Sequence, residues 1–539
     1  MAKYLRTLVI LFEVDISGIN FSDFESLHVL RLDDGVEELS SSIRKFIHLR
    51  YFDISNTGIK YLPDWIGEFS HLQTLRVDAP YLRKLPSTIK YLINFRHLYI
   101  NEDVELPMGI GRLTSLQTLK YFPVGDEDGC KIEELGSLKN LEGELEIRNL
   151  ERVRDKEEAG KANLFKKSKI LKLCLEWGED REGERNDENV LEGLQPHSDL
   201  RVLEIWGFKG KTFPLWTQKM AVGDVVLNKL MSLSLIDCRE CDEIPMLGHL
   251  PNLKSLLLKG LRDLKCINSS FYGMVNNDTR IVFPALESFQ LNSMPKLAEW
   301  AEIEVSGASE VKLFPRLQHL EIYDCEQLMS VPSHVSSCLE YLKINGTGLE
   351  CLPADWLFCN NETLSTLDVI DCSNLRELGD SCGEQSQGSF TSLCRLQIDE
   401  CEALEYLPCE MLGFSLENLS LKSLSSLKNL ARVYSLTLKG MESWECLPES
   451  IQLLTALFKL SLHDFGMEEL PEWFGNLSSL NWLDLYNCKR LRRLPSVDAM
   501  RRLTTLEQLE IWDCPELVIQ SEAVDSEWPK VSPYPLHPN

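Results

Sequence analysis

Apolar residues along this chain follow one template, L-x-x-L-x-L, from end to end. The segment LEIYDC, from Leu320 to Cys325, ends the template with alternating apolar residues, the period of a strand with one buried face. One copy is weak evidence, but about 21 copies occur, most of them roughly 22 to 31 residues apart. The copies begin at Leu5, Leu27, Leu49, Leu72, Phe95, Leu116, Glu142, Ile170, Leu200, Leu230, Leu253, Leu286, Leu317, Leu339, Leu364, Leu393, Leu416, Val433, Leu457, Leu480 and Leu506.

Each copy predicts one short strand with an inward and an outward face. In the copy that begins at Leu480, Leu483 and Leu485 point inward while Asp484 and Tyr486 point outward. Turns of the form L-x-x-L-P follow several strands, and proline there directs the chain out of the sheet because it fixes φ and lacks an N–H. These turns contain Leu62-Pro63, Leu85-Pro86, Leu352-Pro353, Leu407-Pro408, Leu447-Pro448, Leu470-Pro471 and Leu494-Pro495.

No single unit can bury its own leucines, so the units must stack into a repeat array. The predicted fold is an α/β leucine-rich-repeat solenoid, or horseshoe. A parallel β-sheet lines its concave face, with short helices and irregular turns on the convex face. The array covers residues 1–514, with exposed loops near 176–190 and 266–282, and residues 515–539 form a C-terminal cap and a Pro-containing tail.

The net charge and the number of cysteines argue against some classes of binding partner and indicate a cellular compartment. The net charge of -27 disfavours binding to nucleic acids and anionic membrane surfaces. The 17 cysteines are scattered and odd in number, and the N-terminal apolar run is too short for a membrane-spanning helix. We therefore expect free thiols in a reducing compartment, the cytoplasm or the nucleus, with no membrane insertion.

A cysteine recurs eight residues after several template starts, where each strand ends. We expect its thiol to bond with turn carbonyls, because Thr57 and Thr347 fill the same position in other repeats. Preceding acidic residues should raise the thiol pKa, which argues against nucleophilic catalysis. No enzyme activity, metal or cofactor is expected. This structural ladder contains Cys238, Cys325, Cys372, Cys401, Cys488 and Cys514.

Aromatic and charged residues gather at outward strand positions near the C-terminal end. Exposed aromatics are favoured anchors at protein interfaces, although capping of the solenoid end explains them equally well. A basic stretch that includes Lys489, Arg490, Arg492 and Arg493 is either solvated surface or a docking face for an acidic partner. The predicted protein-binding residues on the concave face are His463, Trp482, Asp484, Tyr486, Glu510, Trp512 and Tyr323.

Several longer segments carry a family resemblance. They are HLRYFDISNTGIKYLPDWIGEFSHLQTL (His48 to Leu75), LTSLQTLKYFPVG (Leu113 to Gly125), IEELGSLKNLEGELEIRNLERV (Ile132 to Val153) and FPLWTQKM (Phe213 to Met220). With the terminal LEQLEIWDCPEL, they resemble the leucine-rich-repeat half of plant nucleotide-binding disease-resistance proteins that carry an N-terminal coiled coil. The resemblance covers nearly the whole chain.

The resemblance implies a recognition and autoinhibition module of an intracellular immune receptor. Its implied partners are a pathogen effector, or a host protein modified by one, and the nucleotide-binding domain of a full-length receptor. The sequence lacks a phosphate loop and a coiled coil, and its repeats begin near residue 5, so we expect a fragment or a short product. The alternative is a substrate adaptor of a ubiquitin ligase, which would need a ligase-binding module before the repeats.

Overall fold

The protein forms two compact units of stacked repeats. In this computed structural model the first unit contains residues 1–264 and 270–275, and the second contains residues 265–269 and 276–539. The structure describes residues 4–11, 24, 26–33, 35–125, 129–178, 186–214, 216, 227–273, 281–303, 311–333, 338–358, 360, 362–378, 392–401, 403–404, 418–421, 433–439, 446–447, 451–452 and 454–517.

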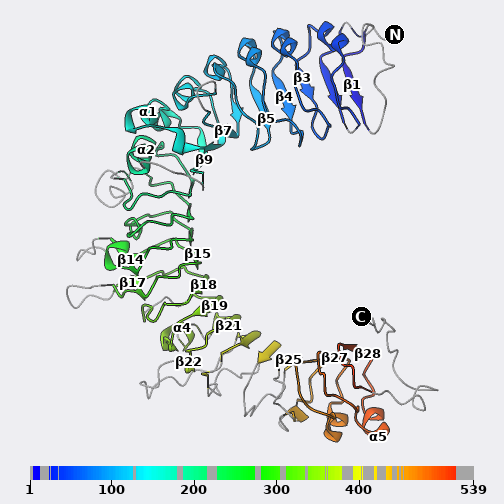
Figure 1. Ribbon diagram of the computed structural model, residues 1–539. Coiled ribbons are helices and arrows are strands. Elements are labelled where there is room, and N and C mark those ends of the chain that lie inside the picture. Colours follow the sequence, from blue (N-terminus) through cyan, green and yellow to red (C-terminus); the bar gives the residue numbers. More distant parts are fainter. Residues whose placement is uncertain are drawn as a thin grey trace. The chain divides into compact units, whose positions relative to one another are not determined.

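Parallel strands in sequence order build the first unit, and Figure 1 shows them along one side of it. One sheet contains β1 Thr7–Ile10, β2 Val29–Leu32, β3 Tyr51–Asp53, β4 Thr74–Val77, β5 His97–Ile100 and β6 Thr118–Leu119. A second run contains β7 Tyr121–Pro123, β8 Gly143–Arg148, β9 Ile170–Glu176, β10 Val202–Trp206, β11 Ser232–Ile236 and β12 Ser255–Lys259.

The second unit repeats this arrangement with longer strands. Its main sheet runs through β15 Ser288–Asn292, β18 His319–Cys325, β19 Tyr341–Thr347, β21 Thr366–Ile370, β23 Arg395–Asp399, β24 Asn418–Leu421, β25 Ser435–Lys439, β26 Lys459–His463, β27 Trp482–Tyr486 and β28 Gln508–Trp512. Short parallel pairs join β13 Cys266–Ile267 to β16 Glu299–Trp300, β14 Ile281–Val282 to β17 Lys312–Leu313, and β20 Cys351–Leu352 to β22 Glu377–Leu378.

A strand lies at each of the 21 template starts. In β27 the burial alternates as predicted: Leu483 and Leu485 are fully buried, while Tyr486 is 43% exposed. Strands β27 and β28 pair Leu483 with Leu509, so equivalent leucines of successive repeats stack in the core, and the β8–β9 pair has a register shift between Gly143 and Glu144. The leucine-rich-repeat solenoid predicted from the template is confirmed.

Short helices carry the chain back on the side opposite the strands (Figure 1). Pro63, Pro86 and Pro471 each lie directly before a 3-10 helix, with φ near −70°, so proline begins the return segment as predicted. The α-helices are α1 Lys156–Gly160, α2 Asp187–Gly193, α4 Ala354–Phe358 and α5 Val497–Arg501. The 3-10 helices are Ser41–Lys45, Asp64–Glu68, Ser87–Tyr91, Ile110–Arg112, Ile132–Ser137, Leu150–Arg152, Leu164–Lys166, Ser269–Tyr272 and Glu472–Asn476.

The residue before each ladder cysteine adopts a left-handed backbone conformation. Asp324, for example, has a φ of 49°, and Gly346 occupies the same position in the next repeat with a φ of 64°. Asp, Asn and Gly tolerate positive φ better than other residues do. The acidic residue that recurs before the cysteine, Asp324 in LEIYDC, is therefore explained by a backbone turn. The same turn occurs at Asp237, Asp371, Glu400, Asn487 and Asp513, with φ between 51° and 56°.

The structure differs from the sequence expectations in three places. The strand expected from the copy that begins at Leu116 is divided in two, because Lys120 separates β6 from β7. The stretch expected as a loop near 266–282 includes Phe271 and Tyr272, which are fully buried, whereas residues 274–280 lie outside the described part. The stretch near 176–190 contains buried Trp177 and the start of α2, with residues 179–185 outside the described part.

Candidate functional site

Six of the predicted recognition residues lie on three neighbouring strands of the second unit. The register aligns Lys459, Trp482 and Gln508 in one row across β26, β27 and β28. The next row contains Ser461, Asp484 and Glu510, and the third contains His463, Tyr486 and Trp512. All nine are outward positions, although Ser461 is only 4% exposed, and we call this set of residues the β26–β28 face.

Internal contacts hold Trp482 and Asp484 in this face. The ammonium of Lys459 lies 4.1 Å from the centre of the Trp482 ring and 3.1 Å from a carboxylate oxygen of Asp484. Asp484 also accepts hydrogen bonds from the indole N–H of Trp482 and, at 2.8 Å, from the hydroxyl of Ser461. Because its contacts are satisfied within the chain, Trp482 is less available to a partner than the sequence suggested.

Tyr486 and Trp512 are the exposed aromatics of the β26–β28 face. Tyr486 is 43% and Trp512 is 49% exposed, and the Tyr486 ring lies 5.3 Å from the imidazole of His463. Glu510 is half-buried beside Asp484 in the register. These side chains combine apolar area with one acidic group, a composition suited to a protein interface.

Tyr323 does not belong to the β26–β28 face. It lies on β18, and five strands separate β18 from β26 in the sheet order. At a spacing of about 4.8 Å per strand, the separation is roughly 29 Å. The Tyr323 ring instead faces the ammonium of Lys343 on the neighbouring β19, at 5.1 Å from its centre.

The thiols of the ladder cysteines lie close to backbone carbonyls at the ends of their strands. The thiol of Cys325 is fully buried and donates to the carbonyl of Tyr323 at 3.2 Å. Thr57, at the same repeat position, also bonds to a turn carbonyl, since its hydroxyl donates to Ile54 three residues earlier at 2.8 Å. The other five thiols each lie 3.3 to 3.7 Å from the carbonyl two residues earlier: Cys238, Cys372, Cys401, Cys488 and Cys514.

Burial is the main influence on several thiol pKa values. It raises the pKa of Cys325 to about 12, and the neighbouring Asp324 adds a smaller upward effect. The expectation that every ladder pKa rises is wrong for Cys372 and Cys514. A hydrogen bond from Cys401 lowers the pKa of Cys372, and one from Cys488 lowers the pKa of Cys514. The contact with Cys372 raises the pKa of Cys401. Cys372 is fully buried, so its thiol is inaccessible to a substrate.

The basic stretch after β27 is neutralised by carboxylates of neighbouring repeats. Glu468 lies 3.4 Å from the guanidinium of Arg490 and 3.3 Å from that of Arg492. Arg492 also contacts Glu516 at 2.8 Å, and Arg493 lies 3.9 Å from Glu469. These ion pairs favour the solvated-surface reading over a docking face for an acidic partner.

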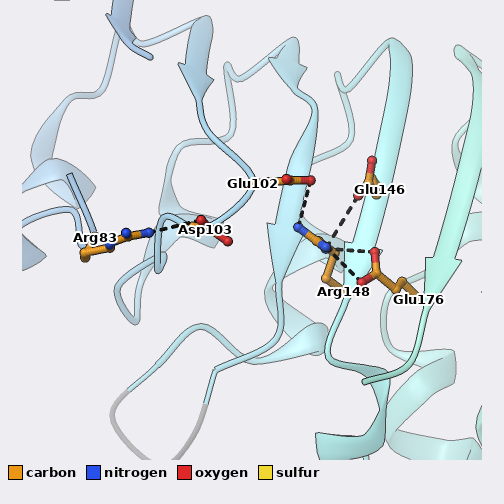
Figure 2. A network of polar contacts seen from close by, with 6 residues as sticks. All are labelled: Arg83, Glu102, Asp103, Glu146, Arg148 and Glu176. Atoms are coloured by element: carbon orange, nitrogen blue, oxygen red, sulfur yellow. Dashed lines mark hydrogen bonds and ion pairs between the residues drawn. The ribbon is translucent and has the colours of Figure 1, made fainter. Parts of the chain in front are cut away.

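A charged cluster in the first unit was not anticipated from the sequence. Figure 2 shows Arg148 of β8 between Glu102, Glu146 and Glu176, while the pair formed by Arg83 and Asp103 lies apart. The guanidinium of Arg148 contacts Glu176 at 2.8 Å, Glu102 at 3.1 Å and Glu146 at 3.6 Å. Burial raises the pKa of Glu146. The cluster cross-links β8 and β9 with the segment that follows β5.

A metal-binding cluster and a membrane-spanning helix were both sought within the described ranges. No group of three or more His, Cys, Asp or Glu side chains there is arranged to hold a metal ion. In that same part of the chain, no helix is long and apolar enough to cross a membrane.

Comparison with known proteins identifies relatives along most of the chain. A family model described as "Leucine-rich repeat region" matches residues 4–322, and one described as "Plant disease resistance protein RPS2-like, leucine-rich repeats" matches residues 363–515. Putative disease resistance RPP13-like protein 1 of Arabidopsis thaliana is 30% identical over 446 residues, covering 75% of this chain and 40% of its own length. Disease resistance protein RGA2 of Solanum bulbocastanum is 33% identical over 366 residues, covering 66% of this chain and 36% of its own length.

The chain thus spans less than half the length of these relatives. Among solved structures, the plant peptide hormone receptor RGFR1 in complex with RGF2 aligns with 94% of this chain and 88% of its own, at 16% identity and a TM-score of 0.40. The repeat pattern, the stacked parallel strands and the family matches lead to one assignment. The chain belongs to the leucine-rich-repeat family, as a repeat region of plant nucleotide-binding leucine-rich-repeat disease-resistance proteins.

Proposed function

We propose that this chain is the recognition and autoinhibition module of a plant intracellular immune receptor. The β26–β28 face binds a pathogen effector or a host protein that an effector has modified. A second contact, with the nucleotide-binding domain of the full-length receptor, keeps that receptor inactive. The cytoplasm, or the nucleus, is the proposed location.

One observation carries the recognition half of the proposal. Tyr486 and Trp512 present 43% and 49% of their surface on adjacent strands of a sheet whose inward leucines are fully buried. Large aromatic side chains supply most of the binding energy at many protein interfaces. The rigid ladder beneath them fixes their positions, which lowers the entropy cost of binding.

Autoinhibition requires that the two contacts be coupled. An effector can activate the receptor only by its difference in affinity between the resting and active states. Binding at the β26–β28 face would therefore have to weaken the contact with the nucleotide-binding domain. The ubiquitin-ligase adaptor alternative receives no support from the relatives, which are named as disease-resistance proteins.

The test places the chain in its receptor context. The chain replaces the repeats of RGA2, and leaves expressing the chimera are challenged with individual pathogen effectors and scored for cell death. We expect no cell death without an effector, a response to a matching effector, and loss of that response in the Trp512→Ala and Tyr486→Ala variants. Tyr61→Ala is the matched control, because Tyr61 is an aromatic that is 83% exposed and lies outside the strands.

Each arm of this test has its own contradicting result. Cell death without an effector would argue against autoinhibition by this chain. A response that survives Trp512→Ala and Tyr486→Ala would place recognition elsewhere. Absence of a response to every effector tested would count against the recognition role itself.

A further inference from the structure

Cations on the strand faces of this protein are held in a recurring way, between an aromatic ring and a carboxylate. Lys459 lies 4.1 Å from the Trp482 ring centre and 3.1 Å from Asp484. In the first unit, the guanidinium of Arg76 lies 4.6 Å from the centre of the Tyr99 ring and 3.8 Å from Asp53. The ring and the carboxylate both attract the positive charge, so each pair forms a small cation-binding site.

Strand β28 offers the same two groups without a cation. Glu510 and Trp512 are two residues apart on one face, as Trp482 and Asp484 are on β27. Within the described residues, the Glu510 carboxylate has no hydrogen bond or ion pair, and the Trp512 ring has no ring contact. Lys459 is already paired with Asp484, so it leaves the charge of Glu510 uncompensated.

Strand order explains why no described residue supplies a cation beside Glu510 and Trp512. In the filled site, Lys459 comes from the strand next to the one that carries Trp482 and Asp484. Strand β28 is the last strand of its sheet among the described residues, so it has a neighbouring strand on one side alone. That neighbour, β27, places Asp484 beside Glu510 and Tyr486 beside Trp512, which adds a second carboxylate and a second ring.

We propose that Glu510 and Trp512 bind an arginine or lysine side chain from a protein segment of the recognised partner. This proposal rests on the proposed function, because it assigns the chemistry of the ligand at the same β26–β28 face. Arginine fits best, since its planar guanidinium can lie flat on an aromatic ring while its N–H groups donate to a carboxylate. An acidic partner segment would meet repulsion from Glu510 and Asp484.

A peptide titration of the full chain tests the proposal. The probe is a fluorescein-labelled Gly-Arg-Gly-Arg-Gly peptide, followed by fluorescence anisotropy, with a citrulline-substituted peptide as the uncharged isostere. We expect Glu510→Gln and Trp512→Ala each to weaken arginine-peptide binding about two- to fivefold, the range for an exposed ion pair or cation–π contact. The citrulline peptide should bind more weakly and be insensitive to Glu510→Gln.

The matched control separates this site from the general attraction of cations to an acidic chain. Glu507→Gln removes the same charge from an exposed residue that lies directly before β28. We expect Glu507→Gln to leave binding unchanged. Equal losses from Glu507→Gln and Glu510→Gln, equal binding of the citrulline peptide, or no binding of the arginine peptide at millimolar concentration would each overturn the inference.

The leaf assay then distinguishes failure of this inference from failure of the proposed function. If Trp512→Ala abolishes the response to the effector and Glu510→Gln leaves it unchanged, the face recognises its partner through apolar contacts, and the cationic assignment is wrong. If neither variant changes the response, the recognition face is elsewhere and both proposals fail. Loss of the response in both variants, together with the peptide result, supports the cationic ligand.

Discussion

The buried thiol of Cys325 should make the protein sensitive to alkaline pH in a way that one substitution removes. Burial raises the pKa of this thiol from its ordinary value of 9.0 to about 12. As the pH rises above 9, the unfolded chain releases the thiol proton while the folded chain retains it. The contribution of Cys325 to stability is therefore complete below pH 9 and is lost progressively as the pH rises towards 12.

The magnitude follows from the linkage between proton binding and unfolding. A difference of one pKa unit corresponds to about 1.4 kcal/mol. At pH 10, one unit above the ordinary pKa, the loss from Cys325 alone is about 1.4 kcal/mol, and it grows with each further pH unit until pH 12. That loss is large enough to measure, since single domains are typically stable by about 5–15 kcal/mol.

The assay compares the parent chain with Cys325→Thr in urea unfolding followed by far-UV circular dichroism at pH 7, 8, 9 and 10. Threonine occupies the same repeat position at Thr57 and Thr347, and the buried Thr57 hydroxyl donates to a turn carbonyl, that of Ile54. We expect similar stability at pH 7 and a relative gain for Cys325→Thr of about 1.4 kcal/mol at pH 10. Cys351→Ser, at an exposed thiol, is the control.

Two results would refute this reasoning. If the parent chain and Cys325→Thr lose stability in parallel up to pH 10, the thiol does not titrate as a buried group. If Cys351→Ser gains as much as Cys325→Thr, the effect belongs to thiols in general and burial is irrelevant. Collapse of the Cys325→Thr array at pH 7 would contradict the structural role of the ladder position.

Three further outcomes are expected. Asp324→Val should destabilise the array by about 1–2 kcal/mol relative to Asp324→Gly in urea unfolding, because the left-handed backbone there excludes a β-branched residue. Arg148→Met should cost about 1–3 kcal/mol by leaving three carboxylates close together, and the cost should shrink in 1 M NaCl; an equal cost at both salt concentrations would contradict the electrostatic explanation. Gly67→Ala should lower the thermal midpoint because its Cβ would lie 2.4 Å from the carbonyl oxygen of Thr88, whereas Gly58→Ala, with its nearest contact at 3.4 Å, should be close to neutral.

The strand positions were predictable because they depend on spacing alone. Inward leucines such as Leu483 and Leu485 follow the period of a strand, and that period survives whatever the neighbouring repeats contain. The break between β6 and β7 was not predicted, because the template runs through it from Leu119 to Tyr121 without a change of spacing. The burial of Phe271 and Tyr272 was not predicted either, since they lie in a polar stretch with no period to follow.

The sequence indicated which residues of the candidate site occupy outward strand positions, but it did not indicate which of their side chains are exposed. Outward positions identified Trp482 and Trp512 equally, yet Lys459 from the preceding strand covers one of them and leaves the other exposed. That difference depends on side-chain conformations across neighbouring strands, which a linear pattern does not encode. The positive φ of Asp324 was visible in principle, because Asp, Asn and Gly share that position along the chain.

The break in the sheet at Lys120, between β6 and β7, affects the order in which parts of the first unit unfold. Strands β1 to β6 form a sheet of their own, and the described hydrogen bonds across the interruption include those from Glu142 N–H to the Gln117 carbonyl and from Glu146 N–H to the Lys120 carbonyl. Repeat proteins open at their weakest interface between neighbours. Under partial denaturation, we expect the amides of these six strands to exchange with solvent as one group, before those of β8 and β9, with the boundary at Lys120.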